Sequence, residues 1–331
     1  MRTKPSIMTS SKLLPIAAAI ITCSFLAFAS QAASEPKQDA GAASQPKAFD
    51  TLNQAADGLL QAAETFDVAA LKEILGPHSE DIINSEDPVM DKNHAVAFAA
   101  KAKEKNSIEI DKKDPNRAVL SIGNDDLTFP IPIVKQKGKW FFDTKVGREE
   151  ILNRRIGSNE LDAITICRGF DEAQHEYAQE LHDDSKVHQY AQHILSTSGK
   201  HDGLAWQNQD GTWGGPVGQE VAKALEESYK AERGTPYHGY YFKVLKGQGP
   251  AAPMGEMDFT VGGAMIGGFA LAAAPAEYRV TGVETFIVGP DGVVYEKDLG
   301  PNTLKTFQSL DNYNPDKTWQ ETDDDVEDSG D

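Results

Sequence analysis

Histidines in the second half of the chain are the first residues to consider for chemistry. His182 and His188 flank an Asp183-Asp184 pair, so His182, Asp184 and His188 form a candidate set of nitrogen and oxygen metal ligands. No two histidines have the short spacing that places a ligand pair on one strand or helix. We therefore expect most histidines to be solvated or locally hydrogen bonded, and we expect no cofactor. The metal hypothesis rests on His182, Asp184 and His188.

Motifs for covalent catalysis do not stand out. The chain contains no Gly-x-Ser-x-Gly nucleophile elbow. Cys167 falls in an apolar stripe at helical spacing, which favours a small buried hydrophobe over a reactive thiol. The glycine-rich run 261–268 lacks the Gly-Lys-Ser/Thr ending of a phosphate loop, so it predicts a turn. We find no catalytic motif, and the sequence favours a protein that is not an enzyme.

Aromatic residues suggest a different kind of site. Trp206 and Trp213 fall in a glycine-rich segment, 196–217, that predicts a long loop, and Tyr240 and Tyr241 begin an aromatic strand. Aromatic side chains with a polar edge are common at binding surfaces. We predict that these four residues contribute to a ligand or partner surface. The alternative for the tryptophans is packing beneath the loop.

The first 32 residues have the pattern of a cleavable signal peptide. Basic residues precede an apolar run, and small residues follow that run. The apolar run is too short to favour a membrane anchor, so we expect no membrane span after cleavage. Lipoprotein anchoring at Cys23 is disfavoured, because Thr22 stands where a smaller residue is expected. We expect a periplasmic or secreted protein, with residues 33–47 as a flexible linker.

Cleavage makes an acidic protein more acidic. The removed segment carries three basic and no acidic side chains, so the formal charge falls from −19 to −22. Such a surface repels the phosphates of nucleic acids, so we expect no nucleic-acid partner. One of the two cysteines is also removed, which leaves Cys167 without a disulfide partner in the mature chain.

Residues 48–146 predict an N-terminal α+β domain. Three helices are expected: one begins after Asp50, the next is capped by Asp67, and the last spans Pro88 to Glu104. An alternating pattern then predicts an antiparallel meander over 107–142, with prolines in its third strand, 129–133. The order is similar to cone-shaped folds resembling nuclear transport factor 2, which often enclose an apolar pocket.

Residues 147–319 predict a helical plus antiparallel β domain. We expect a long helix capped by Ser158, a short helix over 187–195, and a helix from Pro216 to about Tyr229. A four-stranded antiparallel sheet should follow, with a hairpin at 289–292. This part is similar to type IV pilin globular domains. Residues 320–331 predict an acidic disordered tail.

Several long segments carry a resemblance to one family. They cover 189–192, 198–204, 238–245, 268–278, 282–288 and 292–300. Together they resemble the bacterial "domain of unknown function 2950" family of exported proteins, over about residues 49–319. The resemblance implies an exported, acidic, two-part protein and no established activity.

Three functional hypotheses remain. The leading one is a non-enzymatic binding or assembly module in the envelope, whose partner is an envelope protein or a small apolar ligand. The second is a periplasmic hydrolase that acts on envelope material, with carboxylates or the histidines between 175 and 201 as acid–base groups. The third is a pilin-like structural subunit.

Overall fold

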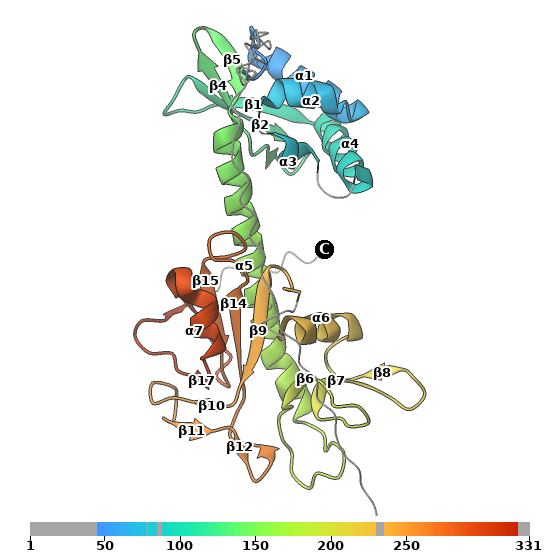
Figure 1. The fold of residues 1–331 in the computed structure, drawn as a ribbon, viewed down its shortest axis with the longest axis vertical. Coiled ribbons are helices and arrows are strands. Elements are labelled where there is room, and N and C mark those ends of the chain that lie inside the picture. Colours follow the sequence, from blue (N-terminus) through green and yellow to red (C-terminus); the bar gives the residue numbers. More distant parts are fainter. Residues whose placement is uncertain (1–44, 78, 85–87, 230–234, 324–331) are drawn as a thin grey trace, which may run out of the picture. The chain divides into compact units, whose positions relative to one another are not determined.

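The structure is a computed structural model that describes residues 45–77, 79–84, 88–229 and 235–323 (Figure 1). The predicted signal peptide, most of the predicted linker and most of the predicted acidic tail lie outside these residues. The described residues contain helices and several antiparallel sheets, so the predicted α+β class is confirmed. None of the described helices is both long enough and apolar enough to cross a membrane.

Four helices come first in the described chain. They are α1 (Leu52–Thr65), α2 (Val68–Leu75), α3 (Glu80–Ile83) and α4 (Pro88–Glu104). The side chain of Thr51 accepts a hydrogen bond from the Gln54 N–H, so Thr51, not Asp50, is the N-cap of α1. Asp67 caps α2 as predicted.

The helices pack on an antiparallel sheet in the order β1-β2-β4-β5, and β3 pairs with β2. The strands are β1 (Asn106–Ile110), β2 (Arg117–Ile122), β3 (Leu127–Thr128), β4 (Ile133–Gln136) and β5 (Lys139–Phe142). The predicted third strand, 129–133, is misplaced by several residues. Pro130 and Pro132 lack the N–H that a ladder needs, so β4 begins only after them. Buried side chains between Phe49 and Phe142 form the first hydrophobic core.

Helix α5 (Thr144–Tyr177) is 34 residues long and runs through the predicted boundary at 146/147. It begins at Asp143, whose carboxylate accepts from the Val146 N–H. Ser158 therefore lies inside the helix, and the prediction that it is the N-cap is wrong. The buried residues of its second half, including Ile164, Cys167 and Phe170, belong to a second hydrophobic core drawn from residues 163–313.

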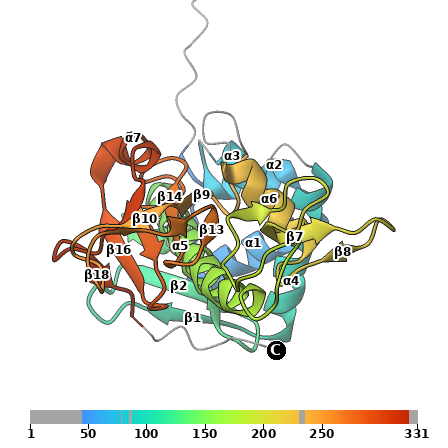
Figure 2. The same cartoon turned by 90° about the horizontal axis from the view of Figure 1, so that it is seen from below.

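The second core lies against a five-stranded antiparallel sheet in the order β18-β16-β15-β14-β9 (Figures 1 and 2). The strands are β9 (Tyr240–Leu245), β14 (Ala270–Pro275), β15 (Glu284–Val288), β16 (Val294–Asp298) and β18 (Gln320–Glu321). The predicted four strands and the 289–292 hairpin are confirmed. The fifth strand, β18, uses the first residues of the predicted tail. The remaining elements around this sheet are α7 (Thr303–Gln308), the 3-10 turn η1 (Gly300–Asn302), β10 (Gly247–Gln248), β11 (Met257–Asp258) and β17 (Asn312–Tyr313).

The segment between α5 and β9 differs most from prediction. No helix forms over 187–195; the ordered elements are β6 (His193–Leu195), β7 (Gly203–Gln207), β8 (Trp213–Gly214) and α6 (Gln219–Tyr229). The N–H groups of Tyr190, Ala191 and Gln192 donate to Met265 O, Gln174 Oε1 and Asp202 O. Long-range acceptors thus replace the i−4 carbonyls that a helix would use. The predicted long loop over 196–217 is partly a small sheet. The predicted helix is confirmed, but α6 begins at Gln219, so Pro216 precedes the helix and does not lie in its first turn.

Candidate functional site: a polar cleft

A cleft of about 1170 Å³ opens between the chain after α5 and a glycine turn. We call it the polar cleft. The turn joins β12 (Thr260–Val261) to β13 (Ala264–Met265). Most of the lining groups are polar, and they come from Tyr177, His182, Asp183, Asp184, Ser185, Gln189, Gln192, His193, Thr197, Gly199, Lys200, His201, Asp202, Gly262, Gly263 and Ala264.

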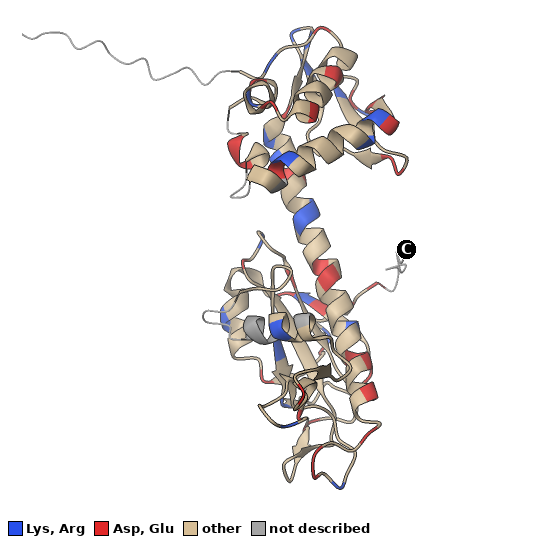
Figure 3. Ribbon diagram, turned by 90° about the vertical axis from the view of Figure 1, so that its right-hand side faces the viewer, with Lys and Arg blue, Asp and Glu red and all other residues tan. Residues whose placement is uncertain are grey.

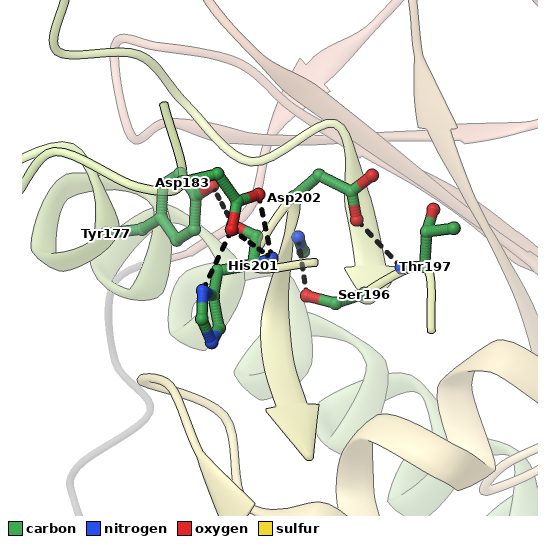
Figure 4. Close-up of polar contacts among 7 residues, drawn as sticks. Tyr177, Asp183, Ser196, Thr197, His201 and Asp202 are labelled. Atoms are coloured by element: carbon green, nitrogen blue, oxygen red, sulfur yellow. Dashed lines mark hydrogen bonds and ion pairs between the residues drawn. The ribbon is translucent and has the colours of Figure 1, made fainter. Parts of the chain in front are cut away.

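Asp183 and His201 form the best-defined pair of the polar cleft (Figure 4). The main-chain N–H of His201 donates to both carboxylate oxygens of Asp183, at 3.2 and 3.0 Å. The imidazole Nδ1 of His201 lies 3.0 Å from Asp183 Oδ1. Because a carboxylate only accepts, the hydrogen of the neutral ring sits on Nδ1 and Nε2 remains an acceptor.

Asp183 holds this position in a left-handed backbone conformation, with φ at 49°. Asp and Asn adopt this region more readily than other non-glycine residues, although it still costs free energy. The hydrogen bonds to His201 offset that cost. Residues in such sparsely populated conformations cluster at functional sites.

Aromatic rings pack against the Asp183–His201 pair and its neighbours. The Tyr177 hydroxyl donates to the His201 carbonyl, and its ring stacks on His182 with centroids 3.8 Å apart. Trp206 meets the ring of Tyr177 edge-to-face at 6.5 Å, that of His182 at 5.5 Å and that of His201 at 5.0 Å. Burial, with the nearby charges of Asp183 and Asp202, raises the pKa of Tyr177, so the hydroxyl keeps its proton.

The loop that presents Lys200 is closed by its own hydrogen bonds. Asp202 Oδ1 accepts from the Thr197 N–H at 2.7 Å, and the Gly203 N–H donates to Ser196 Oγ at 2.8 Å. The Lys200 N–H donates to the Thr197 carbonyl at 2.9 Å. These bonds fix the 197–203 loop, so Lys200 and Asp202 face the polar cleft on a tight turn.

The opposite wall is the glycine turn. Gly262 and Gly263 both have positive φ, and β12 pairs antiparallel with β13 across them. Gln192 Nε2 donates to the Gly263 carbonyl at 2.8 Å, and Gln189 Oε1 accepts from the Met265 N–H at 3.3 Å. The prediction that this run is a turn is confirmed, and glutamine side chains attach it to the rest of the cleft.

The predicted metal ligands are placed as follows. His182 Nε2 lies 2.8 Å from the Tyr177 carbonyl, and His188 Nδ1 lies 2.9 Å from the Ala178 carbonyl. Asp184 lines the polar cleft. Among the described residues no three His, Cys, Asp or Glu side chains are grouped to hold a metal ion. The set His182, Asp184 and His188 stays a prediction.

The predicted aromatic surface is only partly accessible. Tyr240 is fully buried and its hydroxyl donates to the Glu284 carbonyl, so the prediction that it faces a ligand is wrong. Because of its position in β9, the Tyr240 side chain points into the second core. Trp206, Trp213 and Tyr241 are half-buried against that core, and the Lys223 ammonium lies 5.1 Å from the centre of the Trp213 ring.

Of Tyr177, Asp183, His201 and Asp202, the sequence hypotheses name only Asp183, beside the predicted metal ligands, and His201, among the histidines between 175 and 201. One signal points to three of them: the dipeptide His-Asp occurs at 182–183 and again at 201–202, and both copies line the polar cleft. Tyr177 gives no such signal, because it continues the apolar stripe of α5.

Comparison with known proteins assigns a family. No curated protein and no solved structure matches the chain. The family model described as "Protein of unknown function (DUF2950)" matches residues 46–322, which include both hydrophobic cores and the polar cleft. Since the match covers most of the chain and agrees with the resemblance found in the sequence, the protein belongs to the DUF2950 family.

Proposed function

We propose that this protein is an exported binding module whose polar cleft holds a positively charged segment of an envelope partner, most simply a basic peptide. The observation that carries the proposal is the set of carboxylates at the cleft. Asp183, Asp184 and Asp202 line it beside a single lysine, Lys200. Such a lining favours a hydrogen-bonding cation over an apolar ligand.

Three further features support the proposal. After cleavage the formal charge of −22 attracts basic partners. Acidic and basic residues are both spread along the ribbon (Figure 3). The cleft groups are also held in place before a ligand binds, because Asp183 is fixed by His201 and Asp202 is fixed by the Thr197 N–H. A pre-ordered site loses less conformational entropy on binding. The signal-like N-terminus supports export.

The test uses labelled pentalysine amide as probe, with pentaglutamate and chitopentaose for comparison, in fluorescence anisotropy. Salt is kept at about 0.15 M to screen the general attraction of an acidic protein. We expect saturable binding of pentalysine, weakened about fivefold or more by Asp184→Asn through loss of one charge contact.

The matched control is Asp162→Asn. Asp162 is a partly exposed carboxylate that pairs with His238 at 2.6 Å, and neither residue lines the polar cleft. Asp162→Asn makes the same change in net charge as Asp184→Asn and should leave the binding of pentalysine unchanged. Equal effects of the two substitutions, or preference for chitopentaose, would reject the proposal.

A hydrolase that acts on envelope material is the second candidate, and the Asp183–His201 pair is the observation that favours it. An imidazole held through Nδ1 can accept a proton at Nε2, as a general base does. If the protein releases soluble fragments from purified peptidoglycan sacculi, His201→Gln should lower that rate about 100-fold. Asp162→Asn should not change it. Absence of release by the unmodified protein would dismiss this candidate.

A further inference from the structure

A second cavity, partly open to solvent, lies at the edge of the first core, in a part of the chain unrelated to the polar cleft. It has a volume of about 270 Å³ and is lined by α1, α2, α3 and α4 together with Phe129. Apart from Asp91 and His94, its lining side chains are apolar. A cavity of about 150 Å³ lined by apolar side chains is large enough for benzene. This cavity therefore has room for one or two fused rings.

Two aromatic side chains shape the inner wall. The rings of Phe98 on α4 and Phe129 before β4 lie 5.2 Å apart, tilted by 46°. Both residues are only partly buried although they pack on the first core. Offset and tilted ring pairs leave an aromatic face and an aromatic edge available to a third ring. The wall is thus suited to a flat aromatic guest.

Phe66 lines the same cavity and has an unusual backbone. It ends α1 in the left-handed conformation, with φ at 50°, where glycine is the common residue. A bulky side chain at positive φ is an outlier that needs compensation. Here the Phe66 and Asp67 N–H groups donate to Ala63 O and Ala62 O, which locks the turn. The locked turn holds an aromatic ring at the cavity at a conformational cost.

Polar groups meet the cavity at one side. Asp91 and His94 are three residues apart on α4, so they share a helix face, and His94 is exposed to solvent. Ala95 lies beside them, half-buried, and also lines the cavity. A guest that fills the apolar part can therefore place one polar substituent next to a carboxylate and an imidazole.

We propose that this cavity binds a small aromatic molecule of one or two rings that carries a single hydrogen-bond donor, a hydroxyl or a ring N–H. The rings pack among Phe66, Phe98 and Phe129, and the donor points toward Asp91 and His94. This site is independent of the function proposed for the polar cleft, since the two share no residue.

Indole and benzene are the probes, titrated into the whole mature protein and followed by calorimetry and by NMR shifts of the core methyl groups. We expect saturable binding of one indole per chain and weaker binding of benzene. Ala95→Phe should reduce indole affinity tenfold or more by filling the cavity. Ala97→Phe is the control, because Ala97 is exposed on the same helix and does not line the cavity.

A second variant covers the case in which Ala95→Phe unfolds the domain. His94 is exposed, so His94→Ala should fold, and it should weaken indole while leaving benzene unchanged. Asp184→Asn in the polar cleft should alter neither titration. The proposal is overturned if neither probe saturates, if Ala97→Phe reduces binding as much as Ala95→Phe, or if His94→Ala affects both probes equally.

Discussion

Asp183 binds both the main-chain N–H and the imidazole Nδ1 of His201, across 18 residues of sequence, and so closes the segment between α5 and β7 into a loop. The same carboxylate sits in a left-handed conformation. One side chain thus stabilises the backbone that presents Asp184, His193 and Lys200 to the polar cleft.

Replacing Asp183 by Asn should loosen this loop. Asn tolerates the left-handed conformation but loses the charge on the acceptor, so we expect about 1 kcal/mol less free energy of unfolding. Urea titration measures the change, and hydrogen exchange should show faster opening of the His201 N–H. Asp162→Asn removes the charge from the exposed Asp162–His238 pair and should lower the free energy of unfolding by a smaller amount. The prediction is contradicted if the His201 N–H of the variant exchanges at the same rate as that of the unmodified protein.

Position 203 should tolerate no side chain. A Cβ on Gly203, the first residue of β7, would lie 2.6 Å from Ser196 N, directly after the end of β6. Gly203→Ala must push the two strands apart, and we expect a loss of about 2–3 kcal/mol. Gly218→Ala is the control, because a Cβ there meets nothing within 4 Å. Thermal unfolding compares the two, and equal midpoints would show that the strand spacing adapts.

Stability should depend on pH through Glu284. Burial, followed by the charges of Glu296, Asp298 and Glu160, raises the pKa of Glu284 from 4.5 to about 7. The folded state therefore favours the protonated carboxyl. Its extra stability is fully present below pH 4.5 and is lost as pH rises through about 7.

Glu284→Gln should flatten this part of the pH profile, since the amide mimics the neutral acid. The measurement is the free energy of unfolding at several pH values between 4.5 and 7.5, with Glu277→Gln as an exposed control of equal charge change. A variant whose stability falls with pH as steeply as that of the unmodified protein would show that other carboxyls dominate.

Cys167 should be chemically silent in the native state. It is fully buried, and burial raises the pKa of its thiol to about 12, so almost no thiolate forms at neutral pH. A chain that begins at residue 33 has no other cysteine. An aromatic disulfide reagent should therefore react with no thiol in the native protein and with one thiol per chain in guanidinium. Rapid reaction of the native protein would contradict the predicted burial.

Local sequence determined the elements whose hydrogen bonds are made nearby. The Asp67 cap, helix α4 and the hairpin at 289–292 follow from capping, helical spacing and turn residues, and all three are confirmed. The α+β class and the family likewise follow from patterns visible along the chain. These features need no partner from a distant part of the sequence.

Tertiary structure decided the site. Residues 187–195 have no helix because their N–H groups find distant acceptors, and Tyr240 lies in the core because β9 pairs with β14. The polar cleft brings together the end of α5, two His-Asp dipeptides and a glycine turn near residue 262. Spacing along the chain carries no information about such contacts, since they form only when the second core has packed.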